Sequence, residues 1–300
     1  MAKPIRLVDD HQHAFWLDRD DAGLVQDLDE QDIDYAWLLT WEIPPDQHDP
    51  NQTAILNPNN IRADGTHAGL TLQDVITAHH HFPARFIPGY CPYPALPNAC
   101  DLLRAAAKIH GVRICGEWKF RMLVNDPRTL ELFRVAGELH MPVLLHFDVP
   151  YLPGPDGRPV YQKQWYGGTV ENLEATLRAC PGTNFIGHAP GFWREISANA
   201  DQDPTAYPKG PITGPGRLYR LFETYPNLFA DLSANSGRTA IARDPVHGRN
   251  FILRFADRLL FGRDGHGGDL WQFLQTLDLP QDVLDKTCFR NAERLVPPQS

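Results

Sequence analysis

Ile5-Arg6-Leu7-Val8-Asp9-Asp10-His11-Gln12-His13 is the stretch of sequence that decides the fold. The apolar run 5–8 predicts a strand that leaves the core, and His11 and His13 follow at its carboxyl end. Side chains two apart in a strand point to the same face, so the two imidazoles project together. Neutral imidazole is a ligand for zinc, iron, nickel and copper, so this pair can hold one metal ion. The alternative is two polar residues in a loop after a first strand.

Three later segments repeat this pattern of an apolar run that leads into a ligand-type residue. The runs 142–145, 184–187 and 259–263 lead into His146, His188 and Asp264. A lone histidine at a strand end is usually a hydrogen-bonded core or rim residue. A barrel of parallel strands, however, brings the ends of distant strands together, and zinc takes histidine nitrogen and aspartate oxygen as ligands. The four strand ends together therefore indicate a metal site.

Strand-like and helix-like segments alternate along the chain. The expected strands cover 5–8, 35–40, 86–90, 112–116, 142–145, 184–187, 228–233 and 259–263. The expected helices have apolar residues at helical spacing and cover 22–31, 70–80, 99–109, 127–139, 169–179, 217–224, 248–255 and 270–277. This alternation predicts an α/β fold, the (β/α)8 TIM barrel. Because the sequence has no internal linker and no low-complexity tract, residues 1–300 are expected to form a single domain.

Length and composition limit the class of protein. The 300 residues exceed the roughly 250 that one such barrel needs. A hydrophobic content of 42% and a charged content of 22% are typical of a globular enzyme. The net charge of −9 argues against nucleic-acid binding, which usually requires a basic patch. The expected partner is therefore a small-molecule substrate.

Cysteine usage and the N-terminus predict a cytoplasmic protein. The cysteines are 5 in number, and none of them forms a Cys-x-x-Cys pair, so reduced thiols are expected. The first residues lack the apolar stretch of a secretory signal. No segment approaches the roughly 20 apolar residues of a membrane span, so no membrane association is expected.

Three long segments are rich in proline, glycine, asparagine and aromatic residues: 41–69, 149–168 and 189–216. They follow the second, fifth and sixth expected strands, on the face where a barrel builds its active site. Loops of this length usually line or cover a site. The alternative is that they form contacts between subunits, which would give a homo-oligomer.

Taken together, these residues resemble the amidohydrolase superfamily, and most closely its amidohydrolase-related (amidohydrolase 2) branch, which includes decarboxylases and lactonases. The likeness rests on the stretch 8–13, on Leu145-His146, on Ile186-Gly187-His188 and on the stretch 260–264. The closing stretch 290–295 resembles the terminal helix of that branch. The resemblance implies the barrel fold. It does not imply the substrate, because one fold hosts many reactions.

The resemblance also implies individual roles. His11 and His13 would be metal ligands from the first strand, and His146 a ligand from the fifth. Asp264 would be a ligand from the eighth strand and would also accept a proton from metal-bound water. His188 would be either a further ligand or a nearby catalytic acid or base. The implied cofactor is a divalent metal, with Zn²⁺ expected, as one ion or as two.

The chain departs from the commonest pattern of this branch at the fourth strand, Cys115-Gly116-Glu117-Trp118-Lys119-Phe120. Glu117 and Lys119 are two apart, so they share a face and are expected to point into the site. Glu117 resembles the strand-four glutamate of TatD-type relatives, and we predict that it contacts metal or metal-bound water. The alternatives are an ion pair with Lys119 at the barrel rim and a carbamylated Lys119.

Four residues are predicted to bind substrate. Trp16 and Trp41 lie in or near the strand-end loops and are expected to line an apolar or aromatic pocket, with loop packing as the alternative. Lys119 is expected to contact the substrate, and Arg263 is expected to contact an acid group of the substrate. For Arg263, a structural salt bridge is the alternative.

These parts suit hydrolysis. A metal with an open ligand position lowers the pKa of bound water to about 7. Asp264 can take the proton, and the metal or His188 can stabilise the developing oxyanion. The sequence therefore predicts a metal-dependent hydrolase of a small cyclic or aromatic ester, lactone or amide. A nonoxidative decarboxylase or hydratase on the same scaffold is the alternative.

Overall fold

Parallel strands form the centre of the molecule in the computed structural model, which describes residues 6–50 and 55–298. One sheet has three strands in the order β1-β2-β5, and a second has five in the order β12-β11-β10-β7-β6. Their bounds are β1 (Val8–His13), β2 (Tyr35–Leu39), β5 (Phe86–Pro88), β6 (Cys115–Trp118), β7 (Val143–His146), β10 (Phe185–His188), β11 (Leu228–Asp231) and β12 (Leu259–Leu260). All pairings within these two sheets are parallel.

Backbone contacts join the two sheets at both places where their edge strands meet, β5 with β6 and β12 with β1. Gly89, just after β5, forms a parallel bridge with Ile114, just before β6. Where β12 meets β1, the Asp10 N–H donates to the Phe261 carbonyl at 3.0 Å, and the Asp264 N–H donates to the His11 carbonyl at 2.9 Å. The strands therefore follow one another in chain order around a single ring. The predicted (β/α)8 barrel is confirmed.

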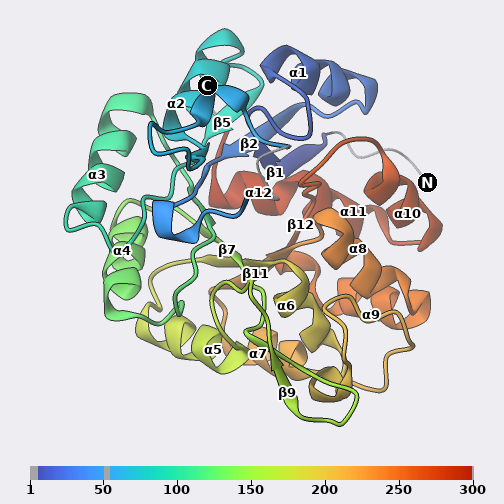
Figure 1. Ribbon diagram of the computed structural model, residues 1–300. Helices are drawn as coiled ribbons and strands as arrows, with labels where there is room; N and C mark the ends of the chain where they lie inside the picture. The colour runs from blue at the N-terminus through green and yellow to red at the C-terminus, as the bar shows by residue number, and fades with distance from the viewer. Residues whose placement is uncertain (1–5, 51–54, 299–300) are drawn as a thin grey trace.

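Helices surround the strands on the outside (Figure 1). The longer ones are α1 (Asp21–Glu30), α2 (Leu72–His81), α3 (Ala99–His110), α4 (Pro127–Glu138), α5 (Val170–Ala179), α7 (Arg217–Thr224), α8 (Ala234–Ala242), α9 (Pro245–Phe255) and α10 (Asp269–Thr276). The shorter ones are α6 (Pro190–Trp193), α11 (Gln281–Asp285) and α12 (Asn291–Leu295). Between α11 and α12 the chain forms a π-helical turn over Lys286–Arg290.

Local sequence signals explain where these helices begin and end. The Asp126 side chain accepts from the Arg128 N–H, with Pro127 in the first turn of α4. Thr71 and Asp74 form a capping box at the start of α2. Gly111 ends α3 with a φ of 67°, a left-handed conformation that glycine adopts without strain.

Two strands differ from the sequence prediction in a way that matters for the site. β1 runs through His13, so His11 and His13 belong to the strand instead of following it. The pairing register between β1 and β2 shifts between Asp9 and Gln12. β6 both begins and ends later than predicted. Because it runs from Cys115 to Trp118, it includes Glu117.

Two of the long segments contain short antiparallel strand pairs. Trp41–Glu42 (β3) pairs with Gly69–Leu70 (β4), and Tyr151–Pro153 (β8) pairs with Pro159–Tyr161 (β9) in a hairpin. The sequence prediction missed α8, whose interior carries Gly237 and other weak helix formers.

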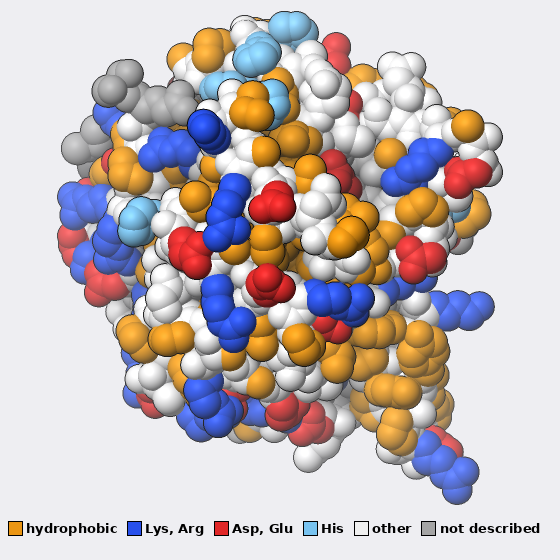
Figure 2. Space-filling view, turned by 90° about the vertical axis from the view of Figure 1, so that its left-hand side faces the viewer, with side chains coloured by type: hydrophobic (Ala, Val, Ile, Leu, Met, Phe, Trp, Pro, Cys, Tyr) orange, Lys and Arg blue, Asp and Glu red, His pale blue; other side chains and the backbone are white. Residues whose placement is uncertain are grey.

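The strands are buried along their whole length in the barrel, and the helix faces that cover them carry large apolar side chains. The outer face over α3 and α4 shows acidic and basic side chains side by side (Figure 2). Arg104 on α3, for example, pairs with Glu138 on α4 at 2.6 Å. Among the helices of the described residues, none has the length and apolar character that a membrane crossing requires.

Candidate metal centre

His11 and His13 bring their Nε2 atoms to within 3.3 Å of each other at the carboxyl end of β1. His13 Nδ1 lies 2.9 Å from the Leu39 carbonyl, and His11 Nδ1 lies 2.9 Å from Asp231 Oδ2. A carbonyl and a carboxylate can only accept, so both Nδ1 atoms carry the proton. Both Nε2 atoms therefore present lone pairs to one point, which is the tautomer that metal-ligating histidines adopt.

Two carboxylates reach the same point. The Nε2 atom of His13 lies 3.6 Å from Glu117 Oε2 on β6 and 3.6 Å from Asp264 Oδ1 beyond β12. His11 Nε2 lies 3.9 Å from each of the same two carboxylates. Among the described residues, neither Glu117 Oε2 nor Asp264 Oδ1 has a hydrogen-bond partner, although both atoms are buried.

These separations fit a shared ion better than direct hydrogen bonds. A distance of 3.6 Å is too long for a hydrogen bond. Tetrahedral ligands at about 2.1 Å from zinc lie roughly 3.4 Å from one another. Unpartnered buried carboxylate oxygens are costly unless something satisfies them, and a divalent cation would do so. The donor set of imidazole nitrogen and carboxylate oxygen therefore fits a divalent metal.

His188 and Asp231 complete the centre. His188 Nε2 lies 3.6 Å from Asp264 Oδ2 and 3.9 Å from Glu117 Oε1. Its Nδ1 lies 3.0 Å from Asp231 Oδ1, while the other oxygen of Asp231 contacts His11. One carboxylate thus orients two histidines. The sequence analysis did not identify Asp231, although it ends an apolar run in the same way as the other strand-end residues.

His146 lies on the far side of Glu117. Its Nδ1 is 2.6 Å from Glu117 Oε1, and its Nε2 is 3.1 Å from Asp148 Oδ2. Glu117, His146 and His188 form a group close enough to hold an ion, as do His11, His13 and Glu117. Glu117 belongs to both groups. The ligand roles of His11, His13, Glu117, His146 and Asp264 stay predictions, as does the catalytic role of His188.

Lys119 and two tryptophans form one wall of the site. The Lys119 ammonium lies 3.7 Å from the centroid of the Trp41 ring and 5.6 Å from that of Tyr166, as cation–π contacts. The Trp16 ring lies 5.4 Å from the His13 ring and 6.1 Å from the Trp41 ring, between centroids. The sequence prediction that these side chains gather at the site is consistent with this placement, and substrate contact stays a prediction.

Arg263 requires a correction. Its Nε lies 2.6 Å from Asp9 Oδ2 and its Nη1 lies 2.6 Å from Asp27 Oδ2. The guanidinium is buried, and the two carboxylates take its Nε and Nη1 donors, while Nη2 has no partner among the described residues. The geometry favours the structural salt bridge over the substrate contact that we predicted. The sequence could not distinguish the two, because Asp27 comes from α1, far away in the chain.

Burial and neighbouring charges shift the pKa values of several side chains in this centre. Burial lowers the pKa of His13 to about 4, which keeps this imidazole neutral at neutral pH. Burial opposes ionisation of Asp264, but His11, His188 and His13 outweigh it and lower the pKa of that carboxyl to about 2. For His188, the charges of Asp231 and Asp264 outweigh burial and raise its pKa well above the ordinary value. Asp264 is thus ionised at neutral pH beside a histidine that holds a proton.

The backbone at Asp264 is also unusual. Its φ is 45°, in the left-handed region that non-glycine residues rarely adopt. Such conformations cluster at functional sites, where the surrounding structure holds them.

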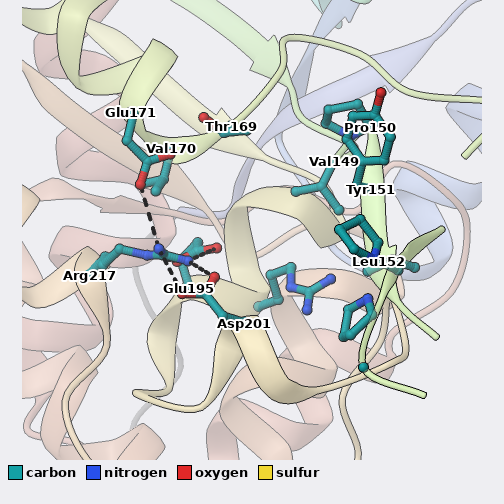
Figure 3. A pocket seen from close by; sticks show the side chains of 14 residues that line it. Val149, Pro150, Tyr151, Leu152, Thr169, Val170, Glu171, Glu195, Asp201 and Arg217 are labelled. Carbon is teal, nitrogen blue, oxygen red and sulfur yellow. Dashed lines mark hydrogen bonds and ion pairs between the residues drawn. The ribbon is translucent and has the colours of Figure 1, made fainter. Parts of the chain in front are cut away.

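Two surface clefts lie near this rim of the barrel. One, of about 250 Å³ and open to solvent, is lined by Asp264, Gly265, His266 and Arg238 among others. The second, of about 240 Å³, lies beneath the β8–β9 hairpin (Figure 3). There Arg217 is paired with Glu171, Glu195 and Asp201, and none of the candidate metal ligands lines the cleft. Asp264 therefore connects the first cleft, and not the second, to the candidate metal centre.

Solved structures with the same fold share little sequence with this chain. A 2,6-dihydroxybenzoate decarboxylase from Rhizobium has 16% identity and a TM-score of 0.60, covering 97% of this chain and 98% of that one. A dihydroxybenzoic acid decarboxylase from Polaromonas sp. JS666, with bound manganese and 2-nitroresorcinol, has 17% identity and a TM-score of 0.55, covering 97% and 96%. A candidate 2-pyrone-4,6-dicarboxylic acid hydrolase from Acinetobacter baumannii, with citric acid bound, has 13% identity and a TM-score of 0.55, covering 97% and 99%.

These comparisons establish the fold. No protein-family model matches the sequence, and no curated protein matches it in a sequence comparison. The likeness to amidohydrolase-type barrels that the sequence predicted is confirmed as a likeness of fold. The similar structures include decarboxylases and a candidate hydrolase, so the fold by itself does not select a reaction.

Proposed function

We propose that this chain is a metal-dependent enzyme of the amidohydrolase superfamily that hydrolyses a small cyclic or aromatic ester, lactone or amide. One observation carries the proposal. The lone pairs of His11 and His13 converge with unpartnered carboxylate oxygens of Glu117 and Asp264 at one buried point. Zn²⁺ is the ion that we propose, because nitrogen and carboxylate ligands suit it.

Some residues of the site would bind the metal ion, and others would transfer protons. His11, His13, Glu117 and Asp264 would hold the ion, and Glu117 is placed to share a second one with His146. When bound, a divalent ion supplies Lewis acidity, which polarises a carbonyl group and lowers the pKa of water.

Proton transfer falls to two side chains. Asp264 is ionised at neutral pH and can accept a proton from the attacking water. His188, 3.6 Å from Asp264 and charged by its neighbours, can donate a proton to the leaving group. Asp231 holds the ring of His188 in place through its Nδ1 atom.

The wall of the site suits a planar, anionic substrate. Lys119 has no hydrogen-bond or ion-pair partner among the described residues and is held over Trp41 by cation–π contact. Glu117 and other acidic neighbours outweigh burial and raise the pKa of Lys119, which favours the charged ammonium form. The ammonium would bind an acidic group, and the Trp16 and Trp41 rings would pack on the substrate.

Nonoxidative decarboxylation is the second candidate, and a specific observation favours it. His188 is held in the protonated form beside the candidate metal ligands, and such a group can deliver a proton to carbon after CO₂ leaves. The two decarboxylases among the similar structures agree with this alternative in fold.

Isotope labelling separates the two reactions. Metal-loaded protein would be incubated with aromatic lactones, esters, amides and hydroxybenzoic acids in ¹⁸O-labelled D₂O. Hydrolysis places one solvent oxygen in the new acid, whereas decarboxylation places one solvent deuteron on carbon and releases CO₂. We expect the ¹⁸O label. A deuterated product without ¹⁸O would establish the second candidate, and no turnover across the panel would overturn the proposed substrate class.

Asp264→Asn tests the mechanism within the same assay. An amide oxygen can still coordinate an ion, but it cannot accept the proton, so we expect turnover to fall at least about 100-fold with moderate metal loss. Asp257→Asn, an exposed carboxylate that pairs with Lys286, is the matched control. Near-normal turnover in Asp264→Asn would show that another group is the base.

A further inference from the structure

A small cavity lies between the loop after β10 and helix α8. It is lined by Pro190, Trp193, Arg194, Ala206, Tyr207, Pro208, Ser236, Thr239, Ala240 and Arg243. Two of these residues are arginines, and no carboxylate lines the cavity. The cavity is separate from the candidate metal ligands, none of which belongs to its lining.

Both arginines leave donors without a partner inside this cavity wall. Arg194 is only 4% exposed, and its Nη2 donates to the carbonyls of Ala200 and Asp203. Its Nη1 is buried and has no acceptor among the described residues. In the same part of the chain, Nε and Nη2 of Arg243 are buried without an acceptor.

No carboxylate in the described part of the chain forms a direct ion pair with either guanidinium, although the charge of Asp203 acts on both at longer range. Within the described residues, no carboxylate oxygen lies within 4.0 Å of the guanidinium of Arg194 or Arg243. Glu195, the neighbour of Arg194 in sequence, pairs with Arg217 instead. Two cationic groups that share a cavity repel each other, and buried donors without acceptors are unfavourable. A bound anion removes both penalties.

We propose that this cavity binds one small monovalent anion of halide size between Arg194 and Arg243. Its free volume of about 10 Å³ has room for roughly one water-sized sphere, so a single-atom anion fits where phosphate does not. The guanidinium donors Arg194 Nη1 and Arg243 Nε and Nη2 would bind the ion, with Ser236 and Thr239 nearby.

The anion would connect to the metal centre through Trp193. This residue lines the cavity, and its Nε1–H donates to the Asp231 carbonyl at 3.0 Å. The Asp231 side chain orients His11 and His188. An anion in the cavity would therefore hold Trp193 in place, and through Trp193 it would hold Asp231, which orients His11 and His188.

Crystallography with bromide tests the site directly. Crystals of the full chain would be grown with sodium bromide, and anomalous scattering would be recorded at the bromine edge. We expect one bromide peak between the two guanidinium groups. A peak of water density alone, or bromide only at the outer surface, would overturn the proposal.

Thermal unfolding in solution, with matched variants, tests anion binding to the cavity a second way. Sodium chloride, formate and phosphate would each be titrated against sodium gluconate at constant ionic strength, with Tm as the readout. We expect a saturable rise with chloride, a smaller one with formate and none with phosphate. Arg243→Gln should raise the chloride Kd at least tenfold, while Arg104→Gln, at an exposed pair, should leave it unchanged.

If Arg243→Gln does not fold, Arg243→Lys keeps the charge but removes the Nε and Nη2 donors. The same loss of chloride affinity is expected. Equal chloride responses in wild type and both Arg243 variants would contradict the site, as would a larger response to phosphate.

Discussion

At the scale of single residues, Asp231 determines how the candidate metal site is arranged. Its two carboxylate oxygens bind the Nδ1 atoms of His11 and His188 at 2.9 and 3.0 Å, and it also accepts from Ser233 Oγ at 2.7 Å. A carboxylate can accept from both histidines at once. An amide cannot, because one of its two polar atoms is a donor.

Asp231→Asn should therefore weaken metal binding without removing a ligand. One histidine would face the amide NH₂ and rotate or change tautomer, and partners of this kind typically contribute 10–100-fold to metal affinity. We expect a loss of about that size in a chelator competition assay. Asp269→Asn, at an exposed ion pair with Arg238, serves as the control. An unchanged metal Kd in Asp231→Asn would show that Asp231 has only a packing role.

At the scale of elements, the helices that cover the barrel are tied by ion pairs of very different strength. Glu174 on α5 accepts from Arg220 on α7 at 2.6 and 2.8 Å and from the Tyr225 hydroxyl at 2.9 Å. The hydrogen bond from Arg220 is the main reason that the pKa of Glu174 is lowered to about 2. A paired and partly buried carboxylate of this kind contributes more than an exposed pair.

The sign of the pH dependence follows from that pKa. Glu174 has a lower pKa in the folded state than in the unfolded chain, where it is about 4.3. Its contribution to stability is therefore complete above about pH 4.5 and is lost as the pH falls towards about 2. Glu174→Gln should lower the free energy of unfolding by about 1–2 kcal/mol at neutral pH, since half-exposed Arg220 is screened by solvent.

Urea unfolding at neutral pH and at about pH 3 measures this difference. The gap between Glu174→Gln and wild type should narrow at the lower pH. Glu138→Gln removes the exposed pair with Arg104 and should cost less than about 1 kcal/mol. A gap that is constant between the two pH values would mean that Glu174 stabilises the fold by packing and not by charge.

Elements also show where sequence patterns stop being informative. The apolar runs located all the barrel strands, because buried parallel strands need continuous apolar residues. They did not locate strand ends, since His11, His13 and Glu117 continue the strands as polar residues turned into the site. The β8–β9 hairpin was missed because none of its strand residues is buried, so no apolar periodicity marks them.

At the scale of the whole molecule, chain order explains which site residues could be predicted. His11, His13, His188 and Asp264 each end an apolar run, and the barrel brings such ends together. The pairing of Arg263 with Asp9 and Asp27, and the contact of His146 with Glu117 on β6, depend on tertiary contacts between distant elements. Patterns within single segments carry no information about those contacts.

The central claim is that one divalent ion binds where β1, β6 and the end of β12 meet. Anomalous diffraction from crystals of zinc-loaded protein, collected on both sides of the zinc edge, tests it most directly. We predict one peak within about 2.0–2.3 Å of His11 Nε2, His13 Nε2 and carboxylate oxygens of Glu117 and Asp264. A map with no peak at this point, or with zinc only on surface histidines, would contradict the account.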